Sequence, residues 1–315
     1  MINFRFHIVS LIAVFLALAL GVVMGATVVN RAIVDRLNSR IDTVEKNANA
    51  RKTESDQLRG QVGQLNGYID GTKDYAVAGR LDGTTLAAIA TRGVDADAVK
   101  QTVTLAQQAG ARAPGIIWLE GKLALSDADT VRQLGELLGK TGQNAKATRD
   151  EAWNAIASRV ATGGGAATNG RDLLAALADA GFISFEPVGN QGDGFSATSF
   201  TGGDVRVLLI DGTNGQVNGN EVLAPLGNAL VANRLRLVVG DVFAQKDKGP
   251  KRGAMLAPIR GDDALKQAVS TVDDLDLVEG RVASVLALAD MNRNVVGQYG
   301  YGTGASKSAP EWPNQ

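Results

Sequence analysis

The stretch Ile8–Val29 reads IVSLIAVFLALALGVVMGATVV and contains no charged residue in 22 positions. A helix needs about 20 predominantly apolar residues to cross the hydrocarbon core of a bilayer. Such a helix satisfies its own backbone hydrogen bonds in lipid, so a spanning segment of this length is expected to be helical. We therefore predict a transmembrane anchor over residues 1–30, from which the rest of the chain extends.

Two other interpretations of this stretch remain open. A cleaved signal peptide has an apolar core of about 7–15 residues and a small-residue cleavage site, and Met24-Gly25-Ala26 is a poor match to such a site. A buried helix of a soluble domain should show a polar face, whereas only Ser10 and Thr27 are polar here. Length and uniformity favour the anchor.

Small residues recur every fourth position within the apolar stretch, at Ala17, Gly21 and Gly25. They lie on one helix face and would let a second helix approach closely, which predicts a contact with a partner helix in the membrane. The alternative is that glycine is simply common in transmembrane helices.

A heptad pattern begins after the apolar stretch, with apolar residues in alternating steps of three and four. The predicted partner-binding seam consists of Val34, Leu37, Ile41, Val44, Leu58, Val62, Leu65 and Ile69. Its centre is weak, because Ala48, Arg51 and Ser55 take core positions there. We predict a coiled-coil stalk over residues 31–71 that pairs with a second copy or with another protein. The alternative is a single helix that packs against the chain's own globular domain.

Residues 72–300 alternate short apolar segments with longer helical patterns. Strands are expected at residues 85–91, 115–120, 182–186, 205–211, 235–241 and 268–272. Helices are expected at residues 95–109, 127–138, 149–161, 171–180, 221–231 and 277–292, between ordinary start and stop signals. This alternation is typical of an α/β fold with a mostly parallel sheet and helices on both faces. Residues 301–315 lose the pattern and are predicted to form a disordered tail.

Carboxylates follow three of the expected strands. Asp211 and Asp241 each end an apolar strand, and Asp273, Asp274 and Asp276 follow the last one. Ligands of doubly wound sheets bind outside the carboxyl ends of the strands, so these residues mark a possible ligand edge for a hard cation or a polar molecule. The alternative is that each aspartate caps the next helix or turn.

The composition excludes several classes of function. A net charge of −1 offers no basic surface for nucleic acid, and the absence of cysteine excludes disulfides and thiolate metal sites. The single histidine, His7, lies beside the apolar stretch, which excludes a Ser-His-Asp triad and a usual zinc site. Phosphate-binding loops and nucleophile motifs are also missing. We expect no enzyme activity, no cofactor and no thiolate or usual zinc site.

Copper(I) prefers sulfur ligands, and the chain offers four scattered methionines for that role. Met1, Met24, Met255 and Met291 form no pair at helical or alternate spacing. We interpret Met24 and Met291 as packing residues.

Five segments carry a resemblance to a known family. They are NFRFHIVSLIAVFLALALGVVMGATV at 3–28, AGRLDG at 78–83, AVSTVDDLD at 268–276, RVASVLALA at 281–289 and GQYGYGTGA at 297–305. Together they resemble the actinobacterial copper transporter family MctB, also described as SteB. The resemblance implies a membrane-anchored envelope protein with a coiled coil and an extracytoplasmic α/β domain. Basic residues flank the apolar stretch on both sides, so the orientation depends on this resemblance rather than on charge.

Two functions follow from the resemblance. One is pairing, as SteB, with the membrane protein SteA to control cell-wall hydrolysis and cell separation. The other is copper export or copper homeostasis, with an outer-membrane location implied by the family label. A pore needs several spanning helices or a barrel, and the chain has one spanning stretch. We therefore favour a non-enzymatic adaptor in the cell membrane that binds a SteA-like protein or a second copy, with copper homeostasis as the alternative.

Overall fold

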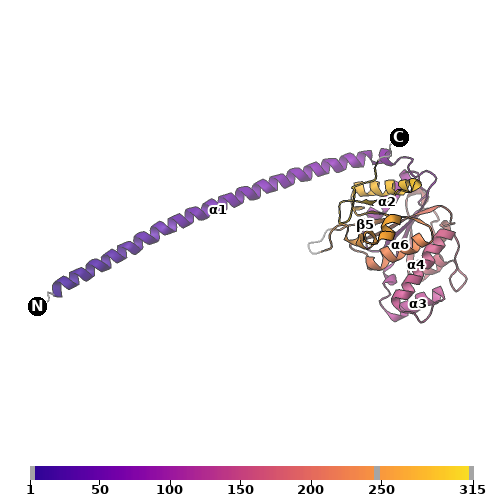
Figure 1. Ribbon diagram of the computed structural model, residues 1–315, viewed down its shortest axis with the longest axis horizontal. Coiled ribbons are helices and arrows are strands. Elements are labelled where there is room, and N and C mark those ends of the chain that lie inside the picture. The colour runs from indigo at the N-terminus through magenta and orange to yellow at the C-terminus, as the bar shows by residue number, and fades with distance from the viewer. Residues whose placement is uncertain (1–3, 245–248, 312–315) are drawn as a thin grey trace. The chain divides into compact units, whose positions relative to one another are not determined.

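The longest element of the protein is one continuous helix. A computed structural model describes residues 4–244 and 249–311, and the chain divides into two compact units, Met1–Leu65 and Asn66–Gln315. Helix α1 (Phe4–Val77) carries the apolar stretch and the heptad pattern without a break (Figure 1). Gly60, Gly63 and Gly67 each cost a helix about 1 kcal/mol, but they do not interrupt it.

The beginning of α1 is the candidate membrane span. Phe4–Gly25 is long and apolar enough to cross a bilayer, and none of it is buried within the protein. The alternative of a buried core helix is therefore wrong. An N-terminal helix of this kind is also compatible with a signal sequence, so the retained anchor stays a prediction.

Seven strands of the described residues form one sheet in the order β3-β2-β1-β4-β5-β6-β7. Their bounds are β1 Thr85–Thr91, β2 Gly115–Leu119, β3 Ile183–Pro187, β4 Val205–Gly212, β5 Arg236–Val242, β6 Val269–Val272 and β7 Gln298–Tyr299. All neighbours pair in parallel except β2 and β3, which are antiparallel. The expected mostly parallel sheet is confirmed, whereas β7 was not expected.

Helices cover both faces of the sheet, because alternate strand residues enter two separate cores. Ile89 and Leu209 pack on the face of α3–α8, while Ala88 and Leu208 pack on the face of α2 and α9. Figure 1 shows α2 and α6 on opposite sides of β5. The helices are α2 Ala96–Gln108, α3 Ala128–Leu138, α4 Ala145–Thr162, α5 Leu173–Asp179, α6 Gly219–Ala232, α7 Ala257–Arg260, α8 Asp263–Ala268 and α9 Val278–Asp290.

The strand order reverses between β1 and β4. From β1 the chain moves outward to β2 and β3, and it then returns to β4 on the other side of β1. Such a reversal is a topological switch point, beside which the carboxyl ends of the strands can form a site. The carboxyl ends of β4, β5 and β6 therefore carry their aspartates along one edge of the sheet.

The C-terminal segment is ordered against the sheet. The Gly300 amide donates to the Lys307 carbonyl, and the Ser306 amide donates to the Gln298 carbonyl. Tyr299 and Lys307 also form an isolated parallel bridge. Residues 301–311 thus correct the expectation of a disordered tail, because long-range backbone hydrogen bonds hold a segment without periodicity. Residues 312–315 lie outside the described residues.

Candidate functional site

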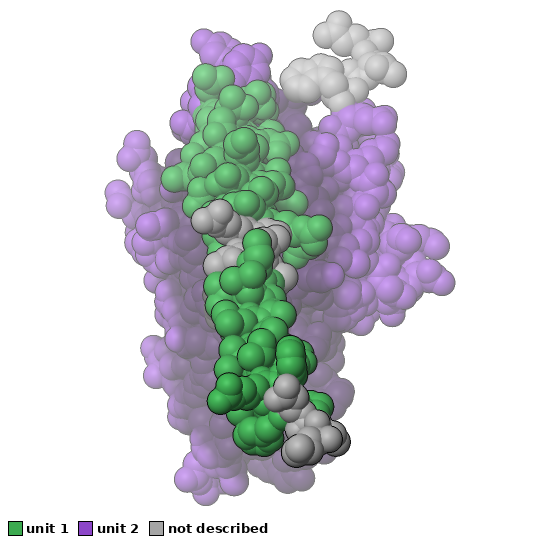
Figure 2. Space-filling model, turned by 90° about the vertical axis from the view of Figure 1, so that its left-hand side faces the viewer, with its two compact units in different colours: residues 1–65 green, residues 66–315 purple. Residues whose placement is uncertain are grey.

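The predicted seam is an exposed row of large apolar side chains on α1. Its first seven members keep 45–65% of their surface exposed, and Ile69 is half-buried. We call these eight residues the apolar row: Val34, Leu37, Ile41, Val44, Leu58, Val62, Leu65 and Ile69. The first seven belong to the unit drawn in green in Figure 2. Within that unit these seven side chains are exposed, and their contact with a partner stays a prediction. An exposed apolar surface is typical of an interaction site.

The small residues of the apolar stretch are open as well. Ala17, Gly21 and Gly25 are exposed, and a Cβ built on either glycine meets nothing within 4 Å. A second helix could approach this face closely. The contact in the membrane stays a prediction.

The five aspartates of the expected ligand edge come together where β4, β5 and β6 end. Asp211 and Asp241 lie directly opposite each other in the parallel register of β4 and β5. All five are fully buried except Asp276, which is half-buried. None of them caps the helix that follows, since the N-cap residue of α6 is Asn218 and that of α9 is Leu277. Capping of the next helix is therefore wrong, and we call Asp211, Asp241, Asp273, Asp274 and Asp276 the carboxylate edge.

Asp273 is the best-partnered member of the edge. Its Oδ2 lies 2.7 Å from Nη1 of Arg260, in an ion pair that is almost completely buried. Its Oδ1 accepts hydrogen bonds from the backbone amides of Tyr301 (2.9 Å) and Gly302 (3.0 Å). Gly300 has φ of 118°, and a Cβ on it would overlap Oδ1 of Asp273. Glycine is thus required where the C-terminal segment passes this carboxylate.

Arg260 joins two segments that carry the family resemblance. Besides Asp273, its guanidinium donates to Thr271 Oγ1 and to the carbonyls of Tyr299 and Thr303. Thr271 and Asp273 belong to AVSTVDDLD, and Tyr299 and Thr303 belong to GQYGYGTGA. The two motifs therefore form one buried network around a single arginine, which spacing along the chain could not reveal.

A second arginine neutralises the outermost aspartate. Arg252 donates to both carboxylate oxygens of Asp276, at 2.7 and 2.8 Å, and to the backbone carbonyl of Asp273. Its guanidinium also stacks over the ring of Phe243 at 4.6 Å. This bidentate pair is a strong type of charge-assisted contact.

The other three carboxyl groups have no such partner. Asp211 accepts one hydrogen bond, from the amide of Gly212. Its second oxygen and both carboxylate oxygens of Asp241 and Asp274 have no hydrogen-bond partner among the described residues. The pKa of each of these three groups is raised to about 7, chiefly by burial, and neighbouring carboxylates contribute to this rise for Asp241 and Asp274. Near neutral pH each of these three carboxyl groups is therefore partly protonated.

The edge does not assemble a metal site in the described part of the chain. No group of three or more His, Cys, Asp or Glu side chains there is placed to hold a metal ion. The chemistry that the geometry supports is proton uptake by buried carboxyl groups rather than coordination of a hard cation.

The two methionines beyond the first helix lie on opposite faces of the sheet. Met255 packs against the core beneath α3–α8, whereas Met291 is buried in the core beneath α2 and α9. The sheet separates their thioethers, so they do not meet on one copper ion. Met24 is exposed on α1.

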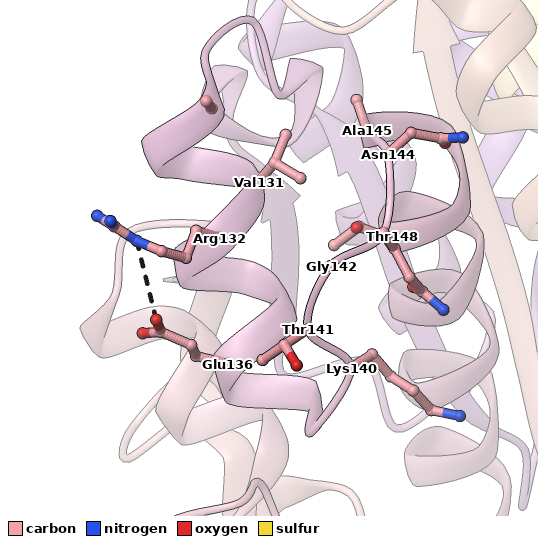
Figure 3. A pocket seen from close by; sticks show the side chains of 11 residues that line it. Val131, Arg132, Glu136, Lys140, Thr141, Gly142, Asn144, Ala145 and Thr148 are labelled. Carbon is pink, nitrogen blue, oxygen red and sulfur yellow. Dashed lines mark ion pairs between the residues drawn. The ribbon is translucent and has the colours of Figure 1, made fainter.

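A cleft that no sequence motif indicated lies between α3 and the start of α4 (Figure 3). Its volume is about 600 Å³. The hydroxyl of Thr148 and the side-chain oxygen of Gln143 are buried there without a hydrogen-bond partner in the described residues. Arg132 and Glu136 lie 3.8 Å apart at its rim. These are ordinary helix and turn residues, so only the packing of α3 beside α4 creates the hollow.

Proteins similar to this chain carry one name. A family model described as "Copper transport outer membrane protein, MctB" matches residues 1–310. A Mycobacterium tuberculosis protein named "Copper transporter MctB" is 28% identical over 97% of this chain and 98% of its own length. A Mycobacterium leprae protein of the same name is 26% identical over the same shares of the two chains.

Proposed function

Because the chain belongs to the MctB family of copper transport outer membrane proteins, we propose that it is a membrane-anchored envelope component of copper homeostasis. The names of its relatives favour this function over the cell-separation adaptor that the residues alone favour. Phe4–Gly25 would provide the anchor. The α/β domain would lie outside the cytoplasm.

We infer that the protein acts by binding a protein partner rather than by coordinating copper. The observation that carries this inference is the exposure of the apolar row, which has the heptad spacing that a second helix requires. The positions of Met255 and Met291 on opposite faces of the sheet argue in the same direction. Copper tolerance would then depend on α1 and not on the methionines.

Complementation of a strain that lacks this protein tests the proposal on a copper gradient. Leu58→Asp combined with Leu65→Asp should fail to restore growth, because two charges interrupt the apolar row. Met255→Leu combined with Met291→Leu should restore growth fully. Ser39→Asp combined with Thr53→Asp places the same two charges on the outer face of α1 and is the matched control. Direct copper handling would be indicated if Met255→Leu with Met291→Leu fails to restore growth while Leu58→Asp with Leu65→Asp, the seam variant, restores it.

Direct copper binding is measured separately by Cu(I) competition titration of the purified full-length protein in detergent. We expect a dissociation constant no tighter than micromolar, a binding free energy of about −8 kcal/mol. The reason is that the protein offers Cu(I) no thiolate and, in its described residues, no pair of thioethers. A stoichiometric sub-nanomolar site would overturn partner binding as the mechanism.

The exposed row also supports a second candidate, in which the partner is a SteA-like membrane protein that controls cell-wall hydrolysis. The same strains distinguish the two functions. Chains of unseparated cells in the seam variant, with normal copper tolerance, would favour the cell-separation role. Copper sensitivity with normal separation would favour copper homeostasis.

A further inference from the structure

The charges beside the apolar row follow a fixed pattern. In heptad notation Val34, Ile41, Val62 and Ile69 take position a, and Leu37, Val44, Leu58 and Leu65 take position d. Positions g and e flank this core and decide which helix can pair with it. The charged residues at position g are Arg40 and Glu54, and those at position e are Glu45, Lys52 and Arg59.

These charges are complementary to a second copy of the same helix. In a parallel, in-register pair each g residue faces the e residue of the following heptad on the other helix. Arg40 then faces Glu45 of the second copy, and Glu54 faces Arg59 of the second copy. Lys52 faces the uncharged Asn47. Symmetry doubles both attractive contacts, and no like charges meet at these positions.

The same charges are largely unused within one chain. Arg40, Glu45 and Glu54 make no ion pair in the described residues, and all three are exposed. Arg59 has only a long, exposed contact of 3.6 Å with Asp56. Surface pairs of this kind contribute little to stability, so no strong ion pair among the described residues competes with pairing to a second helix.

We propose that the occupant of the apolar row is a second copy of this chain, aligned in parallel and in register from residue 34 to residue 69. The inference rests on the proposed function in that the row binds protein. Both copies carry Phe4–Gly25 at the same end of α1, so insertion in one membrane would align the helices in this way. Arg51 at a core d position weakens the centre, although its long stem lets the guanidinium reach the edge of the seam.

The absence of cysteine makes a direct test possible, because one introduced cysteine is unique. Ser55 takes a core a position, whereas Ser39 lies at position f on the outer face. Packed helix axes are about 8–10 Å apart, so a short bismaleimide bridges only residues at the seam. In membranes, full-length Ser55→Cys should give several-fold more crosslinked dimer than Ser39→Cys.

Equal yields from the two variants, or no dimer from either, would overturn the proposal. Crosslinking of Ser55→Cys to a different protein would also overturn self-pairing, but it would leave the proposed function intact. The proposed function would fail in a different experiment: in the copper-gradient complementation, Leu58→Asp with Leu65→Asp would still restore copper tolerance.

Charge exchange tests the register in the Ser55→Cys background. Arg40→Glu alone and Glu45→Arg alone each place like charges opposite each other, so each should lower the dimer yield. Combining both changes in one chain should restore the yield, and co-expression of the two single variants should favour the mixed dimer. A double variant that is no better than either single one contradicts the parallel register.

Substitution of Arg51 distinguishes self-pairing from pairing with an acidic partner helix. In a self-pair two Arg51 side chains meet, so Arg51→Leu should raise the dimer yield several-fold. A foreign helix with a carboxylate opposite Arg51 would instead lose a contact. A lower yield of crosslinked product after Arg51→Leu would therefore overturn the second copy as the occupant.

Discussion

Gly300 lies where the C-terminal segment passes a buried carboxylate. Its φ of 118° is rarely adopted by other residues, and a side chain there would overlap Oδ1 of Asp273. The amides of Tyr301 and Gly302 can donate to that oxygen because the backbone comes this close. One glycine therefore allows the network around Arg260 to form.

Replacing this glycine should destabilise the protein beyond backbone strain alone. Gly300→Ala adds strain of roughly 1–3 kcal/mol and displaces the Asp273 carboxylate, so the free energy of unfolding should fall by more than that. Gly142→Ala is the matched control, because Gly142 has φ of 77° but open space around its Cβ position. Equal losses in chemical denaturation would show that the close approach to Asp273 contributes nothing.

Asp241, like Asp274, has a carboxyl group at the edge without any compensating hydrogen bond from the described residues. It is fully buried, neither oxygen has a hydrogen-bond partner in the described residues, and burial raises its pKa from 3.8 to about 7. The unfolded chain releases this proton near pH 4, whereas the folded protein holds it until about pH 7. The stability that this group contributes is therefore complete at low pH and is lost as the pH rises through 7.

Asp241→Asn should remove part of this pH dependence. The wild-type melting temperature should fall between pH 5 and pH 8, with Asp211 and Asp274 acting in the same direction. The variant should melt above the wild type at pH 8, because it never buries a charge at this position. Asp193→Asn, at an exposed position, should leave the slope unchanged. Parallel slopes for wild type and Asp241→Asn would contradict the assignment.

Helix α1 differs from the other helices in how its apolar residues are used. In α2 and α9 the apolar faces are buried in a core, whereas Leu58 and Leu65 remain 54% and 61% exposed. Most helical stability in proteins comes from packing of an apolar face. The row on α1 thus has apolar surface that is available to a partner.

Leu58→Asp combined with Leu65→Asp should therefore leave the α/β domain folded while it weakens association. The melting temperature and the circular dichroism of the sheet should match the wild type, because neither residue belongs to either core. Crosslinking in membranes should lose the dimer. A lower melting temperature would instead support the helix packing back on its own domain.

The molecule as a whole combines a candidate membrane span with an α/β domain on one polypeptide. Phe4–Gly25 is unburied and apolar, and a single spanning helix of this length is a stable anchor in a bilayer. Retention of this segment decides whether the protein works at the membrane or away from it.

We expect the mature protein to keep its N-terminal residues and to remain with membranes until detergent is added. Mass spectrometry of the purified protein should find its N-terminus before the apolar stretch. A mature N-terminus beyond residue 25 would identify the stretch as a signal sequence. It would also remove the membrane alignment on which parallel pairing depends.

The sequence by itself determined the features that depend on local pattern. Apolar runs such as Val205–Gly212 can be satisfied only in a sheet covered on both faces, so the α/β class and all strands but the last were predictable. The heptad spacing placed the apolar row on one side of α1. Strand ends located the carboxylate edge, because parallel strands finish together.

Only the tertiary structure decided how those carboxylates are partnered. Arg252 and Arg260 come from a segment without periodicity, and their pairing with Asp276 and Asp273 depends on distant parts of the chain meeting. The antiparallel β3 and the ordered residues 301–311 depend equally on hydrogen bonds between distant segments. A charge left unpaired in a buried site costs far more than one in water. The burial that isolates Asp241 and the placement that neutralises Asp273 are therefore properties of the folded chain alone.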